Sequence, residues 1–438
     1  MKCFRISSVL LVLMLRCPAV TIAQLPPGTN VDESKVPAYL TLDPLKDIDG
    51  SIVRTPQQWW QKRRPEILGL FEENVYGRTP ANAHIQLRYK VIEQDRHALQ
   101  GRAVRKQIDV FFTPAEEQGM KMRILLYLPA HAAQRTPVIL GLNFNGNQTA
   151  LDDLAIQPTP VWTKPKGSQE LVHDLPADNS RGTQTQQWQV EKVIAHGYGL
   201  ATIYYGDIEP DFKDAAQYSI RELFGAPGQN ARAPAEWGAI GAWAWGLSRA
   251  LDYLETDKDV DAKHIAVTGH SRLGKVADWA AAQDQRFAAV LSTESGKGGQ
   301  SLSRREIGEP VVHLEHSFPY WFCPNYAQWV DHDRDIPADG NLLLSLIAPR
   351  PLYVASAIGD QYSDPLGEFL SAVSASRVYT LLGRPGLPAD TAMPDVDHPL
   401  LQYEVAYHVR TGKHDVTAFD WDQYLAFLDL HFGKEKNK

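Results

Sequence analysis

Ser271 lies in a short stretch whose residue types and spacing fit a catalytic nucleophile. The apolar run from Ile265 to Thr268 predicts a strand, and the Ala-rich run from Lys275 to Gln283 predicts a helix. Gly269 and Gly274 flank the serine, where a Cβ would clash in so tight a turn. The hydroxyl would then stand clear of the sheet at the positive end of the helix dipole, as in a nucleophile elbow. The alternative is an ordinary strand–turn–helix junction in which Ser271 only caps the helix.

A base and an acid for this serine follow other predicted strands. A serine hydroxyl is a weak nucleophile near neutral pH, so it needs a base, and the base needs a carboxylate that orients it. Glu294 follows the next predicted strand, Asp360 the one after that, and His414 the last. The order Ser, acid, His is that of α/β-hydrolases. Asp360 occupies the more usual place for the acid, and Glu294 remains an alternative or cooperating acid.

The base could be one of several histidines near the end of the sequence. His414 follows the last predicted strand in a Gly-containing loop, where an imidazole has room to move. His398 lies in a loop with no strand before it, and His408 lies inside the last strand and is expected to be packed. We therefore favour His414. His313 and His316 have i, i+3 spacing without further ligands, so we predict no metal site and expect polar pocket or core residues there.

Two cations accompany the predicted elbow. The backbone N–H of Arg272 is placed to help form an oxyanion hole, and its guanidinium could bind an anion with two hydrogen bonds. Lys275, one turn into the helix, would point along the same face. The alternative for Lys275 is a charge on the helix surface.

The elements that must position these residues alternate between strands and helices from about residue 137 to the end. This alternation predicts an α/β fold, a doubly wound three-layer sandwich around a mostly parallel sheet. Two earlier strand-like runs, Leu87 to Ile92 and Ala103 to Phe112, suggest an antiparallel edge. Gln57 to Tyr76 has a helical pattern. Its expected apolar face consists of Trp60, Ile67, Leu70 and Phe71.

The beginning of the sequence resembles a secretory signal. A basic start with Lys2 and Arg5 precedes the apolar run from Ser7 to Leu15, which is too short to span a bilayer. Cleavage is expected after about Ala23, which predicts a periplasmic or secreted protein. Residues 24–438 would then form a single catalytic domain with an N-terminal extension over about residues 24–100.

The composition of the sequence limits the kinds of binding partner and cross-link that we expect. The sequence of 438 residues has a net charge of -8, which argues against a nucleic-acid partner, and no later run suggests a membrane segment. Of the three cysteines, Cys3 and Cys17 fall in the predicted signal, so no disulfide is expected in the mature chain. Cys323 is predicted to be a small buried hydrophobic residue, with a nucleophile as the weaker alternative. A monomer is expected.

Taken together, these motifs resemble the glucuronoyl esterases of carbohydrate esterase family 15, in particular its bacterial branch. The stretch Gly269-His-Ser-Arg-Leu-Gly-Lys275 is similar to that family's G-x-S-R-x-G-K, which accounts for a second glycine one place later than in G-x-S-x-G. Further similar segments are Thr293-Glu-Ser-Gly296, Ala348-Pro-Arg-Pro-Leu352, Asp364-Pro365 and Gly412-Lys-His-Asp415. The resemblance runs from about residue 137 to the end.

The resemblance implies a serine esterase that cleaves esters of 4-O-methyl-glucuronic acid, as in lignin–glucuronoxylan links. It implies Ser271 as nucleophile, His414 as base, Glu294 and Asp360 as acids, and Arg272 at the oxyanion. Lys275 would bind sugar hydroxyls, no cofactor is expected, and Tyr362 stands near the place of a usual pocket Trp. The candidate substrate-binding residues are Lys275, Glu309, Trp321 and Tyr362.

Two other functions remain open. An acetyl-xylan or other carbohydrate esterase could use the same fold, but a neutral acetyl group needs no cations such as Arg272 and Lys275. A non-catalytic carbohydrate-binding protein could use exposed Trp side chains. An intact set of serine, acid and histidine argues against the second of these.

Overall fold

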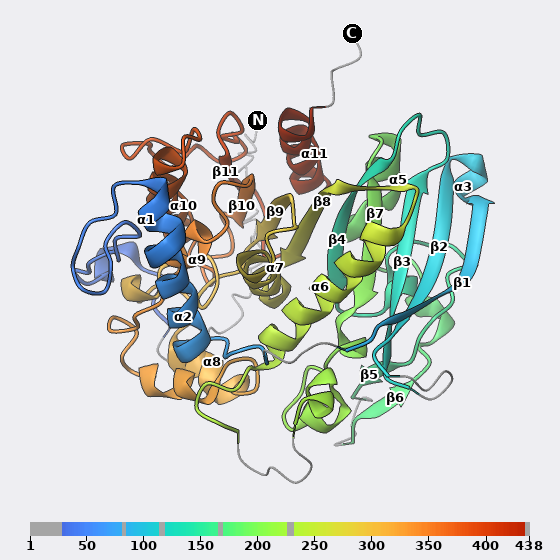
Figure 1. Ribbon diagram of the computed structural model, residues 1–438, viewed down its shortest axis with the longest axis horizontal. Helices are drawn as coiled ribbons and strands as arrows, with labels where there is room; N and C mark the ends of the chain where they lie inside the picture. The colour runs from blue at the N-terminus through green and yellow to red at the C-terminus, as the bar shows by residue number, and fades with distance from the viewer. Residues whose placement is uncertain (1–28, 81–84, 114–118, 165–169, 226–231, 434–438) are drawn as a thin grey trace, which may run out of the picture.

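A twisted sheet forms the centre of the computed structural model, which describes residues 29–80, 85–113, 119–164, 170–225 and 232–433 (Figure 1). Within this part of the chain the sheet has nine strands in the order β1-β2-β3-β7-β4-β8-β9-β10-β11. Their bounds are β1 (Arg88–His97), β2 (Ala103–Phe111), β3 (Lys121–Pro129), β4 (Thr136–Asn143), β7 (Gly199–Tyr204), β8 (Val260–His270), β9 (Ala289–Thr293), β10 (Leu352–Ala357) and β11 (Val405–Arg410). A separate hairpin pairs β5 (Val161–Thr163) with β6 (Val172–Asp174).

Strand directions divide the sheet into two parts. The pairs from β7 through β4, β8, β9 and β10 to β11 are parallel. The pairs β1–β2, β2–β3 and β3–β7 are antiparallel. The predicted parallel sheet with an antiparallel edge is therefore confirmed. Since β1 belongs to this sheet, the sheet already begins within the segment predicted as an N-terminal extension.

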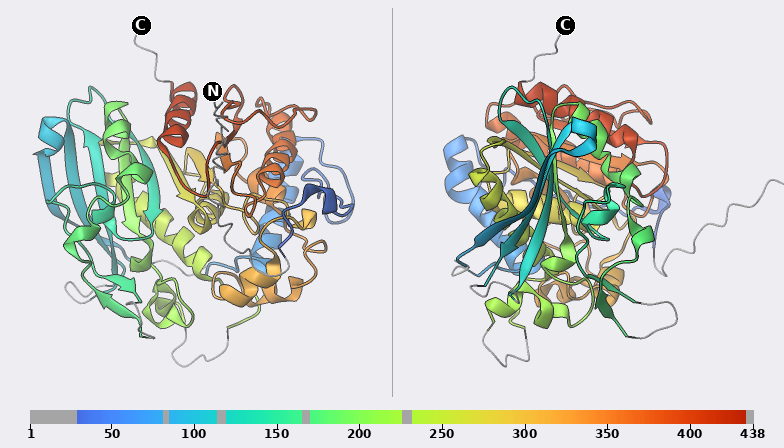
Figure 2. Two further views of the ribbon diagram at one scale, coloured as in Figure 1. Left: turned by 180° about the vertical axis from the view of Figure 1, so that it is seen from behind. Right: turned by 90° about the vertical axis from the view of Figure 1, so that its right-hand side faces the viewer.

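Helices cover both faces of the sheet, as the two views of Figure 2 show. On one face α6, α7 and α10 pack against the strands, with α2 and α9 outside them, and on the other face lie α5 and α11. The helices are α1 (Pro56–Gln58), α2 (Arg64–Asn74), α3 (Ala98–Gly101), α4 (Thr185–Trp188), α5 (Val190–Ala195), α6 (Ala239–Thr256), α7 (Arg272–Gln283), α8 (Val311–Ser317), α9 (Gly340–Ser345), α10 (Pro365–Leu381) and α11 (Ala418–Phe432). Because both faces are covered, every residue of β7, β9, β10 and the edge strand β11 is buried, and most of these residues are apolar.

One predicted helix face is partly wrong. The helical segment that contains α1 and α2 includes a π-helical stretch over Trp59–Arg63, which adds a residue to the turn. As a result Trp59 is fully buried, whereas Trp60, expected on the apolar face, is 37% exposed. Ile67 and Phe71 are buried as predicted.

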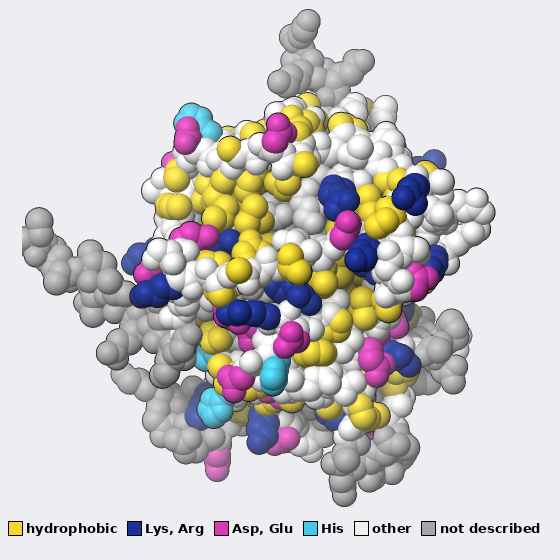
Figure 3. Space-filling view, turned by 90° about the vertical axis from the view of Figure 1, so that its left-hand side faces the viewer, with side chains coloured by type: hydrophobic (Ala, Val, Ile, Leu, Met, Phe, Trp, Pro, Cys, Tyr) yellow, Lys and Arg dark blue, Asp and Glu magenta, His cyan; other side chains and the backbone are white. Residues whose placement is uncertain are grey.

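The surface charge and the helix lengths are relevant to the prediction that the protein has no nucleic-acid or membrane partner. On the face at the left of Figure 1, hydrophobic side chains are interspersed with Lys, Arg, Asp and Glu, and one sign of charge does not dominate (Figure 3). Among the described residues, no helix is both long and apolar enough to cross a membrane. The predicted signal segment, residues 1–23 with Cys3 and Cys17, lies outside the described residues.

Candidate active site

Ser271 occupies a strained turn between β8 and α7. Its backbone angles are φ 59° and ψ -130°, a region that residues with a side chain rarely adopt. A Cβ on Gly269 would lie 1.9 Å from the carbonyl oxygen of Leu273, and one on Gly274 would lie 2.9 Å from Cβ of Ser295. Gly269 therefore allows the turn to close, as predicted for the flanking glycines, and Gly274 allows α7 to approach the end of β9.

The other candidate residues follow strands that lie side by side. Neighbouring strands β8, β9, β10 and β11 end just before Ser271, Glu294, Asp360 and His414, respectively. Parallel strands end at the same edge of a sheet, so the loops that carry these residues meet there. Ser271 and His414 thus lie at the same edge of the sheet, although they are 143 positions apart in the sequence.

The imidazole of His414 lies between the two predicted acids. Its Nδ1 is 2.7 Å from Oδ2 of Asp360, with which it forms a hydrogen bond, and 3.2 Å from Oε2 of Glu294. The hydroxyl of Ser363 donates a further hydrogen bond to Oδ2 of Asp360 at 2.5 Å. With Nδ1 held by carboxylates, the Nε2 atom remains to act as a base.

Glu294 is buried among several donors. The guanidinium of Arg410 lies 3.0 Å from its Oε1, and the backbone N–H of Asp415 donates to its Oε2 at 2.9 Å. Nε2 of His270 is 3.1 Å from the same Oε2, and the ring centroids of His270 and His414 are 4.4 Å apart. Glu294 therefore connects the end of β9 to the loop that carries His414.

The two acids differ in their tendency to ionise. Burial raises the pKa of Glu294 to about 10. The positive charge of Arg410 acts to lower this pKa, whereas the negative charge of Asp360 acts to raise it further. Burial alone would also raise the pKa of Asp360, but the hydrogen bond and charge of His414 hold it below its usual value. Asp360 is therefore the carboxylate that is ionised at neutral pH, and it is also the closer partner of His414.

The other histidines considered from the sequence lie in different surroundings. His408 is fully buried, with Nδ1 2.8 Å from the Tyr353 hydroxyl and Nε2 3.0 Å from Asp420, so its predicted packing is confirmed. His398 is exposed in the loop before β11. Of these three histidines, His414 is the one paired with a carboxylate in the loops at the sheet edge where Ser271 lies.

Arg272, the first residue of α7, is held by aromatic rings and a carboxylate. Its guanidinium carbon lies 4.6 Å from the ring centroid of Trp321, and the guanidinium forms a very short ion pair with Asp211. Asp211 also accepts hydrogen bonds from Trp321 Nε1 at 2.7 Å and from the hydroxyl groups of Tyr320 and Tyr205, at 2.9 and 3.0 Å. Burial alone would lower the pKa of Arg272, but Asp211 raises it. The guanidinium is thus fixed in direction by Asp211 and Trp321.

Replacing Asp211 with asparagine is expected to lower kcat at least about tenfold with a smaller change in KM. The amide oxygen can still accept hydrogen bonds from the Tyr and Trp donors, but the side chain no longer orients Arg272 by charge. Because the oxyanion that Arg272 would stabilise forms only in the transition state, the loss should affect kcat more than KM. Steady-state kinetics on one glucuronate ester measure this split. Asp214→Asn, an exposed change three residues further on, is the matched control. Equal kinetics for the two variants would show that Arg272 does not depend on Asp211.

Lys275 is buried, so the alternative of a surface helix charge is wrong for it. Its Nζ donates to the carbonyl oxygen of Ser295 at 2.5 Å. Burial lowers the pKa of Lys275, while the nearby Glu309 carboxylate opposes this. Glu309 is also 3.7 Å from Nε2 of His313. Burial and Glu309 together raise the pKa of Tyr362, whose ring centroid lies 6.0 Å from that of His313. Lys275, Glu309 and Tyr362, three of the four candidate substrate-binding residues, therefore lie close together in the structure.

Trp321, the fourth substrate-binding candidate, is almost completely buried. Its ring stacks on Phe318 at a centroid distance of 3.9 Å, on the side of the site where Arg272 lies. An influence of Trp321 on substrate would therefore act through Arg272 rather than through an exposed ring. Cys323 is also buried, and burial raises the pKa of its thiol to about 11, which supports the predicted hydrophobic role over a nucleophile.

His270, Glu294 and His414 offer three possible metal ligands within 4.8 Å of one another in the described chain. Each of these atoms already lies at hydrogen-bonding distance from another member or from Asp360. The arrangement therefore fits a hydrogen-bonded acid–base group without a further ligand.

Two residues of this site escaped the sequence reasoning. Asp211 follows β7, and its position after a strand's carboxyl end was the available signal. Arg410 ends the buried strand β11, and its guanidinium binds Glu294, Asp420 and the carbonyl oxygens of Thr411 and Lys413. A charged side chain at the end of a buried strand could have identified it.

Known proteins resemble the chain over nearly its whole length. The carbohydrate esterase MZ0003 of an unknown prokaryotic organism is 45% identical over 406 residues, 93% of each chain. The structure of a glucuronoyl esterase from Solibacter usitatus has a TM-score of 0.86 and 48% identity, and covers 91% of this chain and 100% of that one. A promiscuous CE15 esterase from a marine bacterial metagenome has a TM-score of 0.84 and 44% identity, covering 92% and 100%.

The chain belongs to carbohydrate esterase family 15. The model of glucuronyl esterases from fungi matches residues 229–383, which contain Ser271, Glu294 and Asp360 but end before His414. The resemblance to the bacterial branch of family 15 and the predicted α/β-hydrolase fold are both confirmed.

Proposed function

We propose that this protein is a serine esterase that hydrolyses esters of glucuronic acid. The observation that carries the proposal is the placement of His414 against Asp360 at the sheet edge where Ser271 occupies a nucleophile elbow. The relatives described above support the glucuronate part, because one of them is a glucuronoyl esterase of 48% identity. The 4-O-methyl group and the lignin–glucuronoxylan link remain predictions from the family resemblance.

In the proposed reaction Nε2 of His414 takes the proton of Ser271, whose Oγ attacks the ester carbonyl carbon. The carbonyl oxygen becomes negatively charged and is stabilised by Arg272 and the N-terminus of α7. His414 then gives its proton to the departing alcohol, which leaves an acyl-enzyme. Water, activated by the same imidazole, releases glucuronic acid and restores Ser271. Asp360 keeps the imidazole in the required tautomer and stabilises its charged form.

The sugar would lie against Lys275, Glu309 and Tyr362. An ammonium group, a carboxylate and a phenol together supply donors and acceptors, as the hydroxyl groups of a sugar require. Lys275 has three N–H bonds, of which Ser295 accepts one.

An activity screen tests the proposal. Methyl glucuronate, benzyl glucuronate and acetylated xylan would be compared under one set of conditions. We expect both glucuronate esters to have a kcat/KM at least about tenfold above that for acetyl release. Comparable rates would favour a broader carbohydrate esterase, an outcome made relevant by the relative described as promiscuous. Failure of a fluorophosphonate to label the protein would instead favour a non-catalytic carbohydrate-binding protein.

The two acids are expected to substitute partly for each other. Asp360→Ala removes the closer partner of His414 and also a negative charge that, after burial, raises the pKa of Glu294, so Glu294 ionises more readily and could replace it in part. We expect each single alanine variant to retain measurable turnover, with the larger loss for Asp360→Ala. The double variant should fall towards the level of Ser271→Ala.

Kinetics of both single variants and the double variant on one glucuronate ester measure this interaction. Melting temperatures of the three variants serve as the control for folding. Complete loss of turnover in a folded single variant would identify the replaced residue as the sole acid and would contradict the prediction that Glu294 and Asp360 share this role.

Other expectations remain predictions. We propose export to the periplasm or medium with cleavage after about Ala23, a single catalytic domain over residues 24–438, a monomer, and a reaction without a cofactor. No nucleic-acid or membrane partner is expected.

A further inference from the structure

His270 lies between the nucleophile and the acid–base group of the proposed reaction. It is the last residue of β8 and immediately precedes Ser271. Its Nε2 atom is 3.1 Å from Oε2 of Glu294, and its ring centroid is 4.4 Å from that of His414. The reaction as proposed gives this imidazole no role, although its side chain is only 16% exposed and lies against both the acid and the base.

Oε2 of Glu294 has several nitrogen atoms as neighbours. The backbone N–H of Asp415 donates to it at 2.9 Å, Nε2 of His270 is 3.1 Å away and Nδ1 of His414 is 3.2 Å away. In the proposed reaction, Nδ1 of His414 carries a proton that it donates to Asp360 at 2.7 Å. Of the two imidazole nitrogens, Nε2 of His270 is therefore the one left to share a proton with Glu294.

The surroundings of Glu294 favour its protonated form. Its side chain is fully buried, and the guanidinium of Arg410, 3.0 Å from Oε1, also pairs with Asp420 at 2.8 Å. One guanidinium thus faces two buried carboxyl groups. Burial raises the pKa of Glu294 to about 10; Arg410 acts against this rise, and Asp360 adds to it. At neutral pH Glu294 is therefore a neutral acid with a proton to donate.

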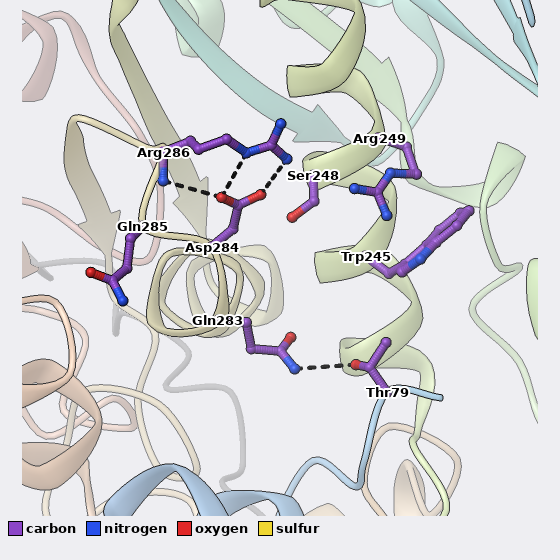
Figure 4. Close-up of a pocket in the computed structure, with 8 residues that line it drawn as sticks. All are labelled: Thr79, Trp245, Ser248, Arg249, Gln283, Asp284, Gln285 and Arg286. Carbon is purple, nitrogen blue, oxygen red and sulfur yellow. Dashed lines mark hydrogen bonds and ion pairs between the residues drawn. The ribbon is translucent and has the colours of Figure 1, made fainter. Parts of the chain in front are cut away.

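A carboxyl group directly after α7 shows the contrasting arrangement. Asp284 accepts hydrogen bonds from Arg286 on both of its oxygens, at 3.0 and 2.7 Å (Figure 4). Burial acts to raise the pKa of Asp284, but the hydrogen bonds and the charge of Arg286 hold it below its usual value. Two bonds to a partly exposed guanidinium keep this group ionised, whereas Glu294 is completely buried and Arg410 bonds to its Oε1.

The imidazole of His270 is suited to accept the proton of Glu294. Burial lowers the pKa of His270 well below its usual value, and His414 acts in the same direction, against Asp360 and Asp420. The ring is therefore neutral at neutral pH and has one protonated and one free nitrogen. In the described chain, Nδ1 of His270 is not among the buried polar atoms that lack a hydrogen bond, so a proton there has a partner or contact with solvent. Nε2 can then be the free nitrogen.

We propose that His270 is a positioning residue whose Nε2 accepts the carboxyl proton of Glu294 and so keeps that proton away from His414. If Glu294 donated instead to Nδ1 of His414, the proton of that imidazole would have to lie on Nε2. In this tautomer Nε2 cannot take the proton of Ser271, and the base would be inactive. His270 thus preserves the tautomer in which His414 donates to Asp360. This inference rests on the proposed esterase function.

Kinetics of His270 variants on methyl glucuronate test the inference. His270→Phe keeps a ring against His414 but has no proton acceptor, and an adjoining cavity of about 50 Å³ gives room for the larger ring. We expect kcat to fall at least about tenfold with little change in KM. His270→Gln, whose carbonyl oxygen can accept the proton, should retain most of the parent kcat. The control is His264→Phe, which removes a histidine paired with Asp261 on the same strand and should have no effect.

Removal of Glu294 should abolish the effect of the phenylalanine. In the Glu294→Ala variant no carboxyl proton competes for His414, so adding His270→Phe should leave kcat unchanged. A merely structural role of His270 would lower kcat in both backgrounds. Equal losses for His270→Phe and His270→Gln, or a folded His270→Phe variant with the parent kcat, would overturn the proposal.

The position of the proton can also be observed without an esterase assay. In ¹⁵N-labelled Ser271→Ala protein, long-range ¹H–¹⁵N spectra distinguish the two imidazole tautomers, and loss of a signal in His270→Gln assigns it. We expect a neutral His270 ring with its proton on Nδ1 at neutral pH. A proton on Nε2, or a charged ring, would contradict the proposal even if His270→Phe does not fold. A parent enzyme that is inactive on every glucuronate ester would instead contradict the proposed function, and the tautomer would still be measured.

Discussion

Ser271→Ala is expected to lower kcat on methyl glucuronate at least about 1,000-fold while the melting temperature stays close to that of the parent. The hydroxyl stands at a turn between β8 and α7 and in the proposed reaction supplies the atom that forms the acyl-enzyme, whereas the turn itself depends on Gly269 and Gly274. Alanine keeps the Cβ and so keeps the packing of the turn. Initial rates over a range of substrate concentrations measure the loss.

Ser34→Ala, an exposed change in a short 3₁₀ helix, is the control and should leave kcat unchanged. A folded Ser271→Ala variant that keeps more than about a tenth of the parent kcat would mean that another group attacks the ester. Loss of fluorophosphonate labelling in the same variant would identify Ser271 independently of the substrate used.

His414→Ala is expected to be about as damaging as Ser271→Ala, and the double variant little worse than either. Without the imidazole the serine hydroxyl has no base, and two residues that act as one unit do not contribute additively. Because His414 is partly exposed and its ring packs mainly against His270, the change should cost little stability. Single and double variants would be compared on one ester.

His398→Ala is the matched control, since it removes an exposed imidazole from the loop that precedes the same strand. We expect less than a twofold change in kcat for it, because its ring has no role in the proposed reaction. A severe loss in His398→Ala with a mild one in His414→Ala would assign the base to the loop of Asp397 and His398 instead.

Local sequence patterns sufficed for the elbow and for the fold class. The change from an apolar strand to an Ala-rich helix around Ser271 involves only neighbouring residues, so it can be recognised without knowledge of the rest of the fold. Alternation of strands and helices likewise restricts the possible sheets, because a parallel connection needs a crossover helix. The chain order of Ser271, Glu294, Asp360 and His414 followed from the same pattern.

Only the tertiary structure decided which of these groups meet. That β9 and β10 are neighbours places both Glu294 and Asp360 beside His414, and the shorter distance belongs to Asp360. Asp211 and Arg272 are 61 positions apart in the sequence, and no local pattern predicts their ion pair. Contacts of this kind depend on the order of strands and the paths of loops.

Burial was the other property that the sequence left open. Lys275 could have been a surface charge, but the close approach of α7 to the loop after β9 encloses it. Trp59 and Trp60 are adjacent and chemically alike, and the extra residue in a π-helical turn determines which of them faces the core. The sequence by itself thus determined the chemical groups and the order of the strand ends that carry them. The three-dimensional packing decided their partners and their ionisation, because distance and burial depend on residues far apart in the chain.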